Sequence, residues 1–174
     1  MAPHTCQRKI QTVVFTSDRY IHAVQPFAYL WNCYVGFPVT VVGFAPPSFP
    51  LPDNFTFHSM GSMANYPWNR WSNCVIDYLS AHHAGGHVLL MLEDYWPVRP
   101  ANIQAIQMLL DYARQFRYVL KVDLCADRLY AGGSTDYGFC NYLDLVKSNP
   151  ASQYHMSLMP GIWNVDLLLQ FLVE

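Results

Sequence analysis

The sequence predicts an α/β fold, a three-layer sandwich in which a mostly parallel central sheet lies between helices. Short β-branched or aliphatic runs alternate with segments in which apolar residues recur every three or four positions. This alternation is typical of right-handed crossovers that place successive strands parallel in one sheet. A chain of 174 residues matches one hydrophobic core, so we expect a single domain over residues 1–174.

The first half of the chain contains three expected strands and one helix. A β-branched run over residues 11–16 predicts a strand that ends in a polar loop. Residues 38–44 and 55–60 predict the next two strands, and the Pro-rich residues 45–52 between them predict a surface loop. The helix between the first two strands has one apolar face, formed by Ala23, Phe27, Leu30, Trp31 and Tyr34.

The middle of the chain contains two clearer helices around a buried strand. Residues 87–92 are almost continuously apolar, which is typical of a strand covered on both faces. Asn102 is an expected N-cap of the helix that follows, and residues 118–124 predict another strand. The two helices have apolar faces formed by Trp68, Trp71, Val75, Tyr78 and Leu79 and by Ile103, Ile106, Leu109, Leu110, Ala113 and Phe116.

The last third of the chain has weaker patterns. After a turn-rich sequence at residues 131–134, we expect a helix over residues 139–147. Residues 154–159 predict the last strand, and residues 164–174 predict a final helix.

Composition excludes several classes of protein. The chain is 52% hydrophobic and only 13% charged, which excludes intrinsic disorder. Its formal net charge of −2 provides no basic field for a phosphate backbone, so we expect no nucleic-acid partner. No apolar run approaches the roughly 18 residues of a membrane span or resembles a signal-peptide core. With five widely spaced cysteines, these features predict a cytoplasmic protein in a reducing environment.

Polar side chains follow three of the expected strands, at residues 16–19, 93–95 and 123–128. In open α/β sheets a ligand lies beyond the carboxyl ends of the strands, where the strand order reverses, so these segments are expected to form one cleft. The adjacent acids Glu93 and Asp94 suit a divalent cation such as Mg²⁺ or Mn²⁺, or ribose hydroxyls. The alternative is an acidic pair on a solvated rim.

Three segments carry a resemblance to a known family. They are residues 88–96 (VLLMLEDYW) with the helix after them, residues 15–20 (FTSDRY) with residues 26–31 behind them, and residues 157–164 (SLMPGIWN). Together they resemble glycosyltransferases of the GT-A fold, also called nucleotide-diphospho-sugar transferases. The resemblance implies an enzyme that binds a nucleotide-diphospho-sugar donor and transfers the sugar to an acceptor hydroxyl.

The resemblance also implies roles for individual residues. Asp94 and Glu93 would be catalytic, facing the diphosphate, with Asp94 as a ligand of a Mn²⁺ or Mg²⁺ cofactor. The nucleotide would be bound by Thr16, Ser17, Asp18 and Arg19, and we add Arg70 as a further candidate. On the sugar and acceptor side we place Tyr95, Asp123, Asp127, Arg128 and Trp163. A solvated rim is an equal alternative for Asp123, Asp127 and Arg128.

The chain departs from the family pattern in two ways. Acids commonly stand at the first and third places of the motif, whereas Tyr95 stands at the third place here, which leaves metal dependence open. Enzymes of this group normally continue beyond the segment at residues 157–164 with acceptor-binding elements. We therefore expect either a chain truncated at its C-terminus or a domain whose missing part comes from a second copy or from a partner chain.

Other functions remain as alternatives. A non-catalytic interaction or assembly module derived from the same fold would explain Tyr95 and the early stop. A nucleotidyltransferase is less favoured because residues 16–20 contain no glycine. His82, His83 and His87 suggest zinc, but a role at a helix terminus is preferred. Helical spacing favours core positions for Trp68 and Trp71 over stacking on a ligand.

Overall fold

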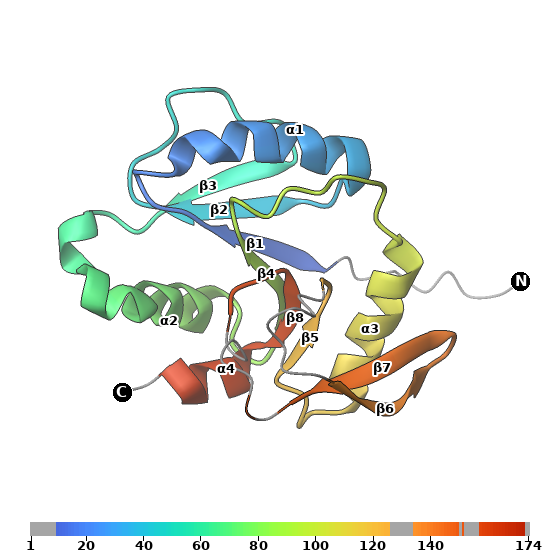
Figure 1. The fold of residues 1–174 in the computed structure, drawn as a ribbon. Helices are drawn as coiled ribbons and strands as arrows, with labels where there is room; N and C mark the ends of the chain where they lie inside the picture. Colours follow the sequence, from blue (N-terminus) through green and yellow to red (C-terminus); the bar gives the residue numbers. More distant parts are fainter. Residues whose placement is uncertain (1–9, 126–133, 150, 152–156, 173–174) are drawn as a thin grey trace, which may run out of the picture.

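The structure, a computed structural model, describes residues 10–125, 134–149, 151 and 157–172 (Figure 1). Its main sheet has six strands in the order β3-β2-β1-β4-β8-β5. In chain order these are β1 (Gln11–Phe15), β2 (Val39–Gly43), β3 (Phe55–Ser59), β4 (His87–Leu92), β5 (Lys121–Asp123) and β8 (Gly161–Asn164). The first four strands are mutually parallel, and β8 runs antiparallel to both β4 and β5. The predicted α/β class with a mostly parallel sheet is therefore confirmed.

Four helices cover the two faces of this sheet (Figure 1). They are α1 (Val24–Tyr34), α2 (Trp71–His82), α3 (Ile103–Gln115) and α4 (Val165–Leu172), and the short 3-10 turns are η1 (Ile21–Ala23), η2 (Met63–Asn65) and η3 (Trp68–Arg70). Buried residues of α1 and α3 pack on one face of the sheet, and those of α2 and α4 pack on the other. Asn102 caps α3 as expected, since its Oδ1 accepts a hydrogen bond of 3.0 Å from the Ala105 N–H.

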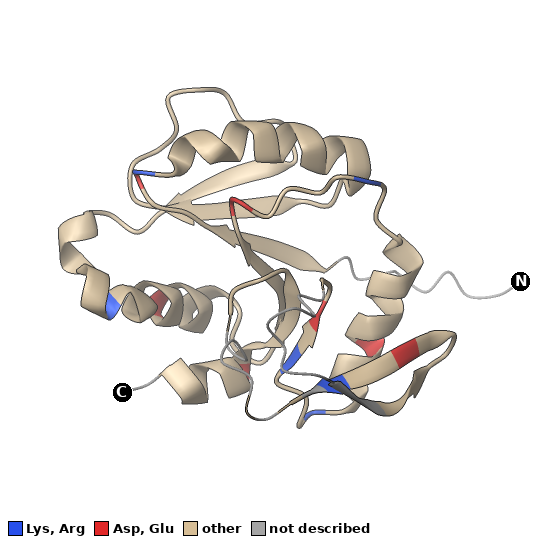
Figure 2. Ribbon diagram, viewed as in Figure 1, with Lys and Arg blue, Asp and Glu red and all other residues tan. Residues whose placement is uncertain are grey.

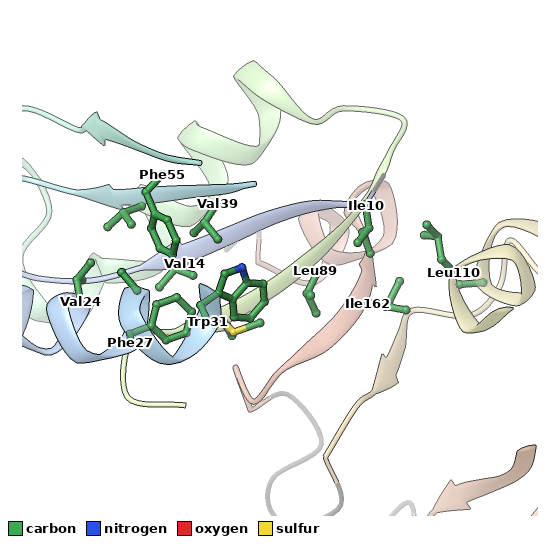
Figure 3. Packing of buried hydrophobic residues seen from close by; sticks show 14 residues of the cluster. Ile10, Val14, Val24, Phe27, Trp31, Val39, Phe55, Leu89, Leu110 and Ile162 are labelled. Carbon is green, nitrogen blue, oxygen red and sulfur yellow. The ribbon is translucent and has the colours of Figure 1, made fainter. Parts of the chain in front are cut away.

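The sheet divides the core into two halves, because successive side chains of a strand point to opposite faces of the sheet. Leu89 and Met91 of β4 join the half under α1 and α3, while Val88 and Leu90 join the half under α2 and α4. In the first half, Phe27 and Trp31 stack with ring centroids 5.3 Å apart, and Figure 3 shows them facing Val14, Val39 and Phe55. Burial on both faces explains why β4 reads as a continuous apolar run.

The prediction of a helix over residues 139–147 is wrong. The structure has an antiparallel hairpin there, made of β6 (Ser134–Cys140) and β7 (Leu143–Ser148). The two strands form a separate sheet beside α3 (Figure 1). Asn141, with φ of 54°, lies in the left-handed region and reverses the chain, and half-buried and exposed residues alternate over residues 143–146 after it. The period of two, rather than the helical period, decides the local structure.

Two strand boundaries also differ. The strand expected over residues 118–124 is shorter in the structure, where only Lys121–Asp123 form a strand, β5. The last strand is β8, Gly161–Asn164, rather than residues 154–159. Part of that expected strand lies outside the described residues, and its described part, residues 157–159, is not a strand.

Candidate functional site

The sheet contains a topological switch point between β1 and β4. The chain passes from β1 to β2 and β3 on one side, and then crosses back to place β4 on the other side of β1. Phe15, the last residue of β1, is in register with Leu92, the last residue of β4. The loops after these strands therefore leave neighbouring positions at the same edge, which we call the carboxyl edge. This is where open α/β sheets bind ligands.

The loop after β1 is tied to the end of β2. The Thr16 N–H donates to the Val42 carbonyl at 2.9 Å, and Asp18 Oδ1 accepts from the Ala45 N–H at 2.8 Å. Thr16 is buried, and a Cβ on Gly43 would lie 3.0 Å from Thr16 Cγ2, so glycine permits the close approach. Thr16 and one oxygen of Asp18 thus fix the shape of the loop.

The two other predicted residues of this loop are more available to a ligand. Ser17 is half-buried, and Arg19 is exposed with its guanidinium 5.3 Å from the ring centroid of Tyr20. Arg19 therefore supplies a cation beside the end of β1.

The loop after β4 contains a buried acid next to an exposed one. Glu93 is 6% exposed, while Asp94 is exposed. Burial raises the pKa of Glu93 to about 7, the hydrogen bond from its own backbone N–H lowers the pKa, and the charge of Asp94 raises it again. The Trp96 indole N–H donates to the Glu93 carbonyl at 2.9 Å. Near neutral pH the pair therefore carries less than its full charge of −2.

Asp123 is held at the end of β5 by a lysine that sequence reasoning did not select. The Lys121 side chain is 7% exposed, forms an ion pair with Asp123, and donates from Nζ to the Ser157 carbonyl at 2.7 Å. Its Nζ also lies 4.7 Å from the ring centroid of Trp163. The signal in the sequence was a lysine two positions before an aspartate within a strand that is otherwise mostly apolar.

The segment before β8 contributes to the same edge. Because β8 is antiparallel, its first residue, Gly161, lies in register with Leu90 of β4 and Asp123 of β5. The Leu124 N–H donates to the Pro160 carbonyl at 2.9 Å, which joins this segment to the end of β5. Ser157 Oγ is buried and has no hydrogen-bond partner among the described residues. Ser157 is a second polar residue that sequence reasoning missed.

The structure places several predicted residues elsewhere. Trp163 of β8 is fully buried in the half of the core under α2 and α4, so its side chain is not exposed to an acceptor. Arg70 is exposed in η3, directly before α2. Tyr95 is half-buried after Asp94. Asp127 and Arg128 lie outside the described residues.

The two tryptophans before α2 behave differently. Trp71 is partly buried, and its ring centroid lies 6.3 Å from that of Phe15 in the core. Trp68 is 92% exposed, so the core position expected from helical spacing is wrong for this residue. The reason is local: α2 begins at Trp71, and Trp68 belongs to the 3-10 turn before it.

Two of the histidines lie at the C-terminal end of α2. His82 is the last residue of α2 and His83 follows it, as expected for a role at a helix terminus. Their rings form a cluster with Tyr78 and with His58 of β3, with centroids 4.8–6.5 Å apart. Across the described ranges, no three His, Cys, Asp or Glu side chains are placed to hold a metal ion.

Lys and Arg are few and lie on separate loops and elements (Figure 2). The longest described helix, α3, has 13 residues, and within the described part of the chain no helix could cross a bilayer. Comparison of the chain with protein-family models and with curated proteins finds no match.

Proposed function

We propose that this chain is a glycosyltransferase-like domain of the GT-A fold that binds a nucleotide-diphospho-sugar donor at the carboxyl edge. With acceptor-binding elements from further residues, a second copy or a partner chain, it would transfer the sugar to an acceptor hydroxyl. The observation that carries the proposal is the register of β1 with β4 at the switch point, which brings the loop carrying Arg19 beside the loop carrying Asp94.

The available side chains at this edge suit the parts of such a donor. Ser17 and the cation of Arg19 would bind the nucleotide and its phosphates, with Arg70 approaching from the start of α2. Asp94 would face the diphosphate. Asp123 and Tyr95 would contact sugar hydroxyls, because a carboxylate and a phenol both form hydrogen bonds with hydroxyl groups.

A Mg²⁺ or Mn²⁺ ion fits this set of groups. Magnesium is commonly bound by one or two carboxylates together with substrate phosphates and water, so a full protein cage is not needed. Asp94 is exposed and would hold the ion, while buried Glu93 would be its neighbour. When bound, the ion would neutralise charge on the diphosphate.

Transfer itself requires the bond from the anomeric carbon to the diphosphate to break while the acceptor oxygen attacks that carbon. The protein would favour this step by stabilising charge on the departing diphosphate and by orienting the acceptor. A protonated Glu93 helps, because it removes one negative charge from beside the anionic donor.

Calorimetry with UDP-, GDP- and CDP-sugars, with and without Mn²⁺, tests the proposal. We expect at least one donor to bind, and the Asp94→Ala variant to bind it about tenfold or more weakly. Asp53→Ala is the matched control, because Asp53 is an exposed acid before β3, at the other edge of the sheet. If no donor binds under any of these conditions, the proposal is wrong.

A second candidate is a non-catalytic interaction module of the same fold. It is favoured by exposed aromatic side chains on and beside the β6–β7 hairpin, namely Tyr118, Tyr137, Phe139 and Tyr142. Unchanged ligand binding and unchanged assembly in Asp94→Ala, measured by calorimetry and light scattering, would support the module.

A further inference from the structure

The loop between β3 and α2 presents a tryptophan to solvent. Trp68 is 92% exposed, although tryptophan is among the residues that proteins bury most on average. Trp71, the first residue of α2, turns inward onto Phe15, so Trp68 is not needed to complete the core there. Packing in the core therefore gives no role to the Trp68 indole, which is open to contact with a ligand.

This loop is anchored at the carboxyl edge. Trp71 contacts the last residue of β1, and the ring centroid of Tyr66 lies 5.9 Å from that of Phe44, just after β2. The Tyr66 hydroxyl donates to Asp77 Oδ2 at 2.8 Å, and the Arg70 N–H donates to the Pro67 carbonyl at 2.7 Å. The turn that carries Trp68 is thus fixed on both sides, so the indole is presented by an ordered support.

The residues next to Trp68 in the sequence are mostly polar. Asn65, Asn69 and Arg70 are exposed, and among the described residues their side chains make no hydrogen bond or ion pair. Amide and guanidinium groups donate hydrogen bonds to hydroxyls, and an indole face packs against the apolar face of a sugar ring. A membrane surface would instead favour a cluster of Lys and Arg, whereas this loop has only Arg70. The combination fits a carbohydrate.

We propose that Trp68, with Asn69 and Arg70, forms the contact surface for a carbohydrate acceptor. This inference rests on the proposed function, because it assigns the second substrate of the same carboxyl edge. A donor held at the switch point between β1 and β4 lies among the loops after those strands. Trp68 follows β3, which is one of the two edge strands of the sheet. Nearly all of the Trp68 side chain is open to a ligand that arrives from solvent.

The test measures binding of cellotriose, maltotriose and chitotriose, by saturation-transfer NMR and calorimetry, to the full chain and its variants. We expect at least one trisaccharide to bind, Trp68→Ala to weaken that binding about tenfold or more, and Trp68→Phe to retain most of it. Tyr29→Ala is the matched control, because Tyr29 is 70% exposed on the outer side of α1, and it should change nothing. Circular dichroism verifies that each variant is folded.

Binding of UDP, GDP and CDP to the same variants separates this inference from the proposed function. Loss of saccharide binding with unchanged nucleotide binding supports the acceptor surface. Equal loss of nucleotide binding in Trp68→Ala shows base stacking and overturns it. It is also overturned if no trisaccharide binds, if Trp68→Ala binds as well as wild type, or if the variant instead loses binding to phosphatidylcholine–phosphatidylglycerol vesicles. Failure to bind any donor, with saccharide binding retained, contradicts only the proposed function.

Discussion

Glu93 shows how burial of one carboxyl changes the chemistry of the carboxyl edge. The sequence identifies it as half of an acidic pair, but the pair is not equivalent in the structure, because Glu93 is buried and Asp94 is exposed. Burial, which depends on the loop that follows β4, is what raises the pKa of Glu93 to about 7. One residue therefore titrates near neutrality, and the other remains available to a ligand.

Replacing Glu93 by glutamine should stabilise the fold at alkaline pH. The raised pKa of Glu93 means that the folded chain holds its proton longer than the unfolded chain, so wild-type stability falls as pH rises from about 4.5 to about 7. We expect Glu93→Gln to increase the free energy of unfolding by about 1–3 kcal/mol at pH 8, and by much less near pH 5. Urea denaturation at both pH values measures this, and an equal gain at both would contradict the assignment.

Lys121 and Gly161 form a coupled pair. A Cβ on Gly161 would lie 2.7 Å from Lys121 Cε, and Lys121 cannot move away without losing Asp123 and the Ser157 carbonyl. We expect Gly161→Ala to lower the free energy of unfolding by about 1–3 kcal/mol.

The control is the same substitution in a Lys121→Ala chain, where the clash is absent and the cost should be smaller. Guanidinium denaturation of the four proteins gives the coupling energy. Strictly additive effects would show that the contact has no energetic consequence.

At the scale of secondary-structure elements, the junction of α2 with β3 is expected to be sensitive to acid. Burial lowers the pKa of His58 and of His83, and the charge of His82 lowers both further. The unfolded chain therefore takes up protons before the folded chain does, and stability falls as pH drops through the ordinary range of histidine.

His58→Phe keeps a ring against Tyr78 and His82 but removes one titrating group. We expect the loss of Tm between pH 7.5 and pH 5.5 to be smaller than in wild type by about 1–3 °C. Thermal unfolding followed by circular dichroism measures it. An identical pH dependence in the variant would rule out His58 as a source.

Elements were predictable where local pattern and burial agree. Residues 87–92 are apolar because both faces of β4 are covered, and Asn102 caps α3 through a bond between near neighbours in sequence. The hairpin was missed because Phe139 and Val146 are exposed, so its apolar residues do not mark a buried face. Asn141 was the available signal in the sequence, because asparagine adopts the left-handed conformation of turns more readily than most residues.

For the whole molecule, the strand order made the candidate site partly predictable. Two polar loops after expected strands were placed together correctly, because parallel strands end at one edge and β1 lies beside β4. The contribution of Lys121 and Ser157 depends on where β8 enters the sheet, which no local pattern encodes. The same long-range pairing buries Trp163, which in the sequence is one aromatic residue among many.

The reversed strand β8 also constrains the order in which the protein can assemble during synthesis. β5 pairs only with β8 in the described sheet, and the two are separated by nearly 40 positions along the chain. While the ribosome is still translating that interval, β1 to β3 already have their neighbours in the sheet, but one edge of β4 is unpaired and β5 has no partner strand. The sheet beyond β4 therefore cannot form until residues 161–164 have been synthesised. Until then the nascent chain exposes an edge that chaperones or other nascent chains can bind.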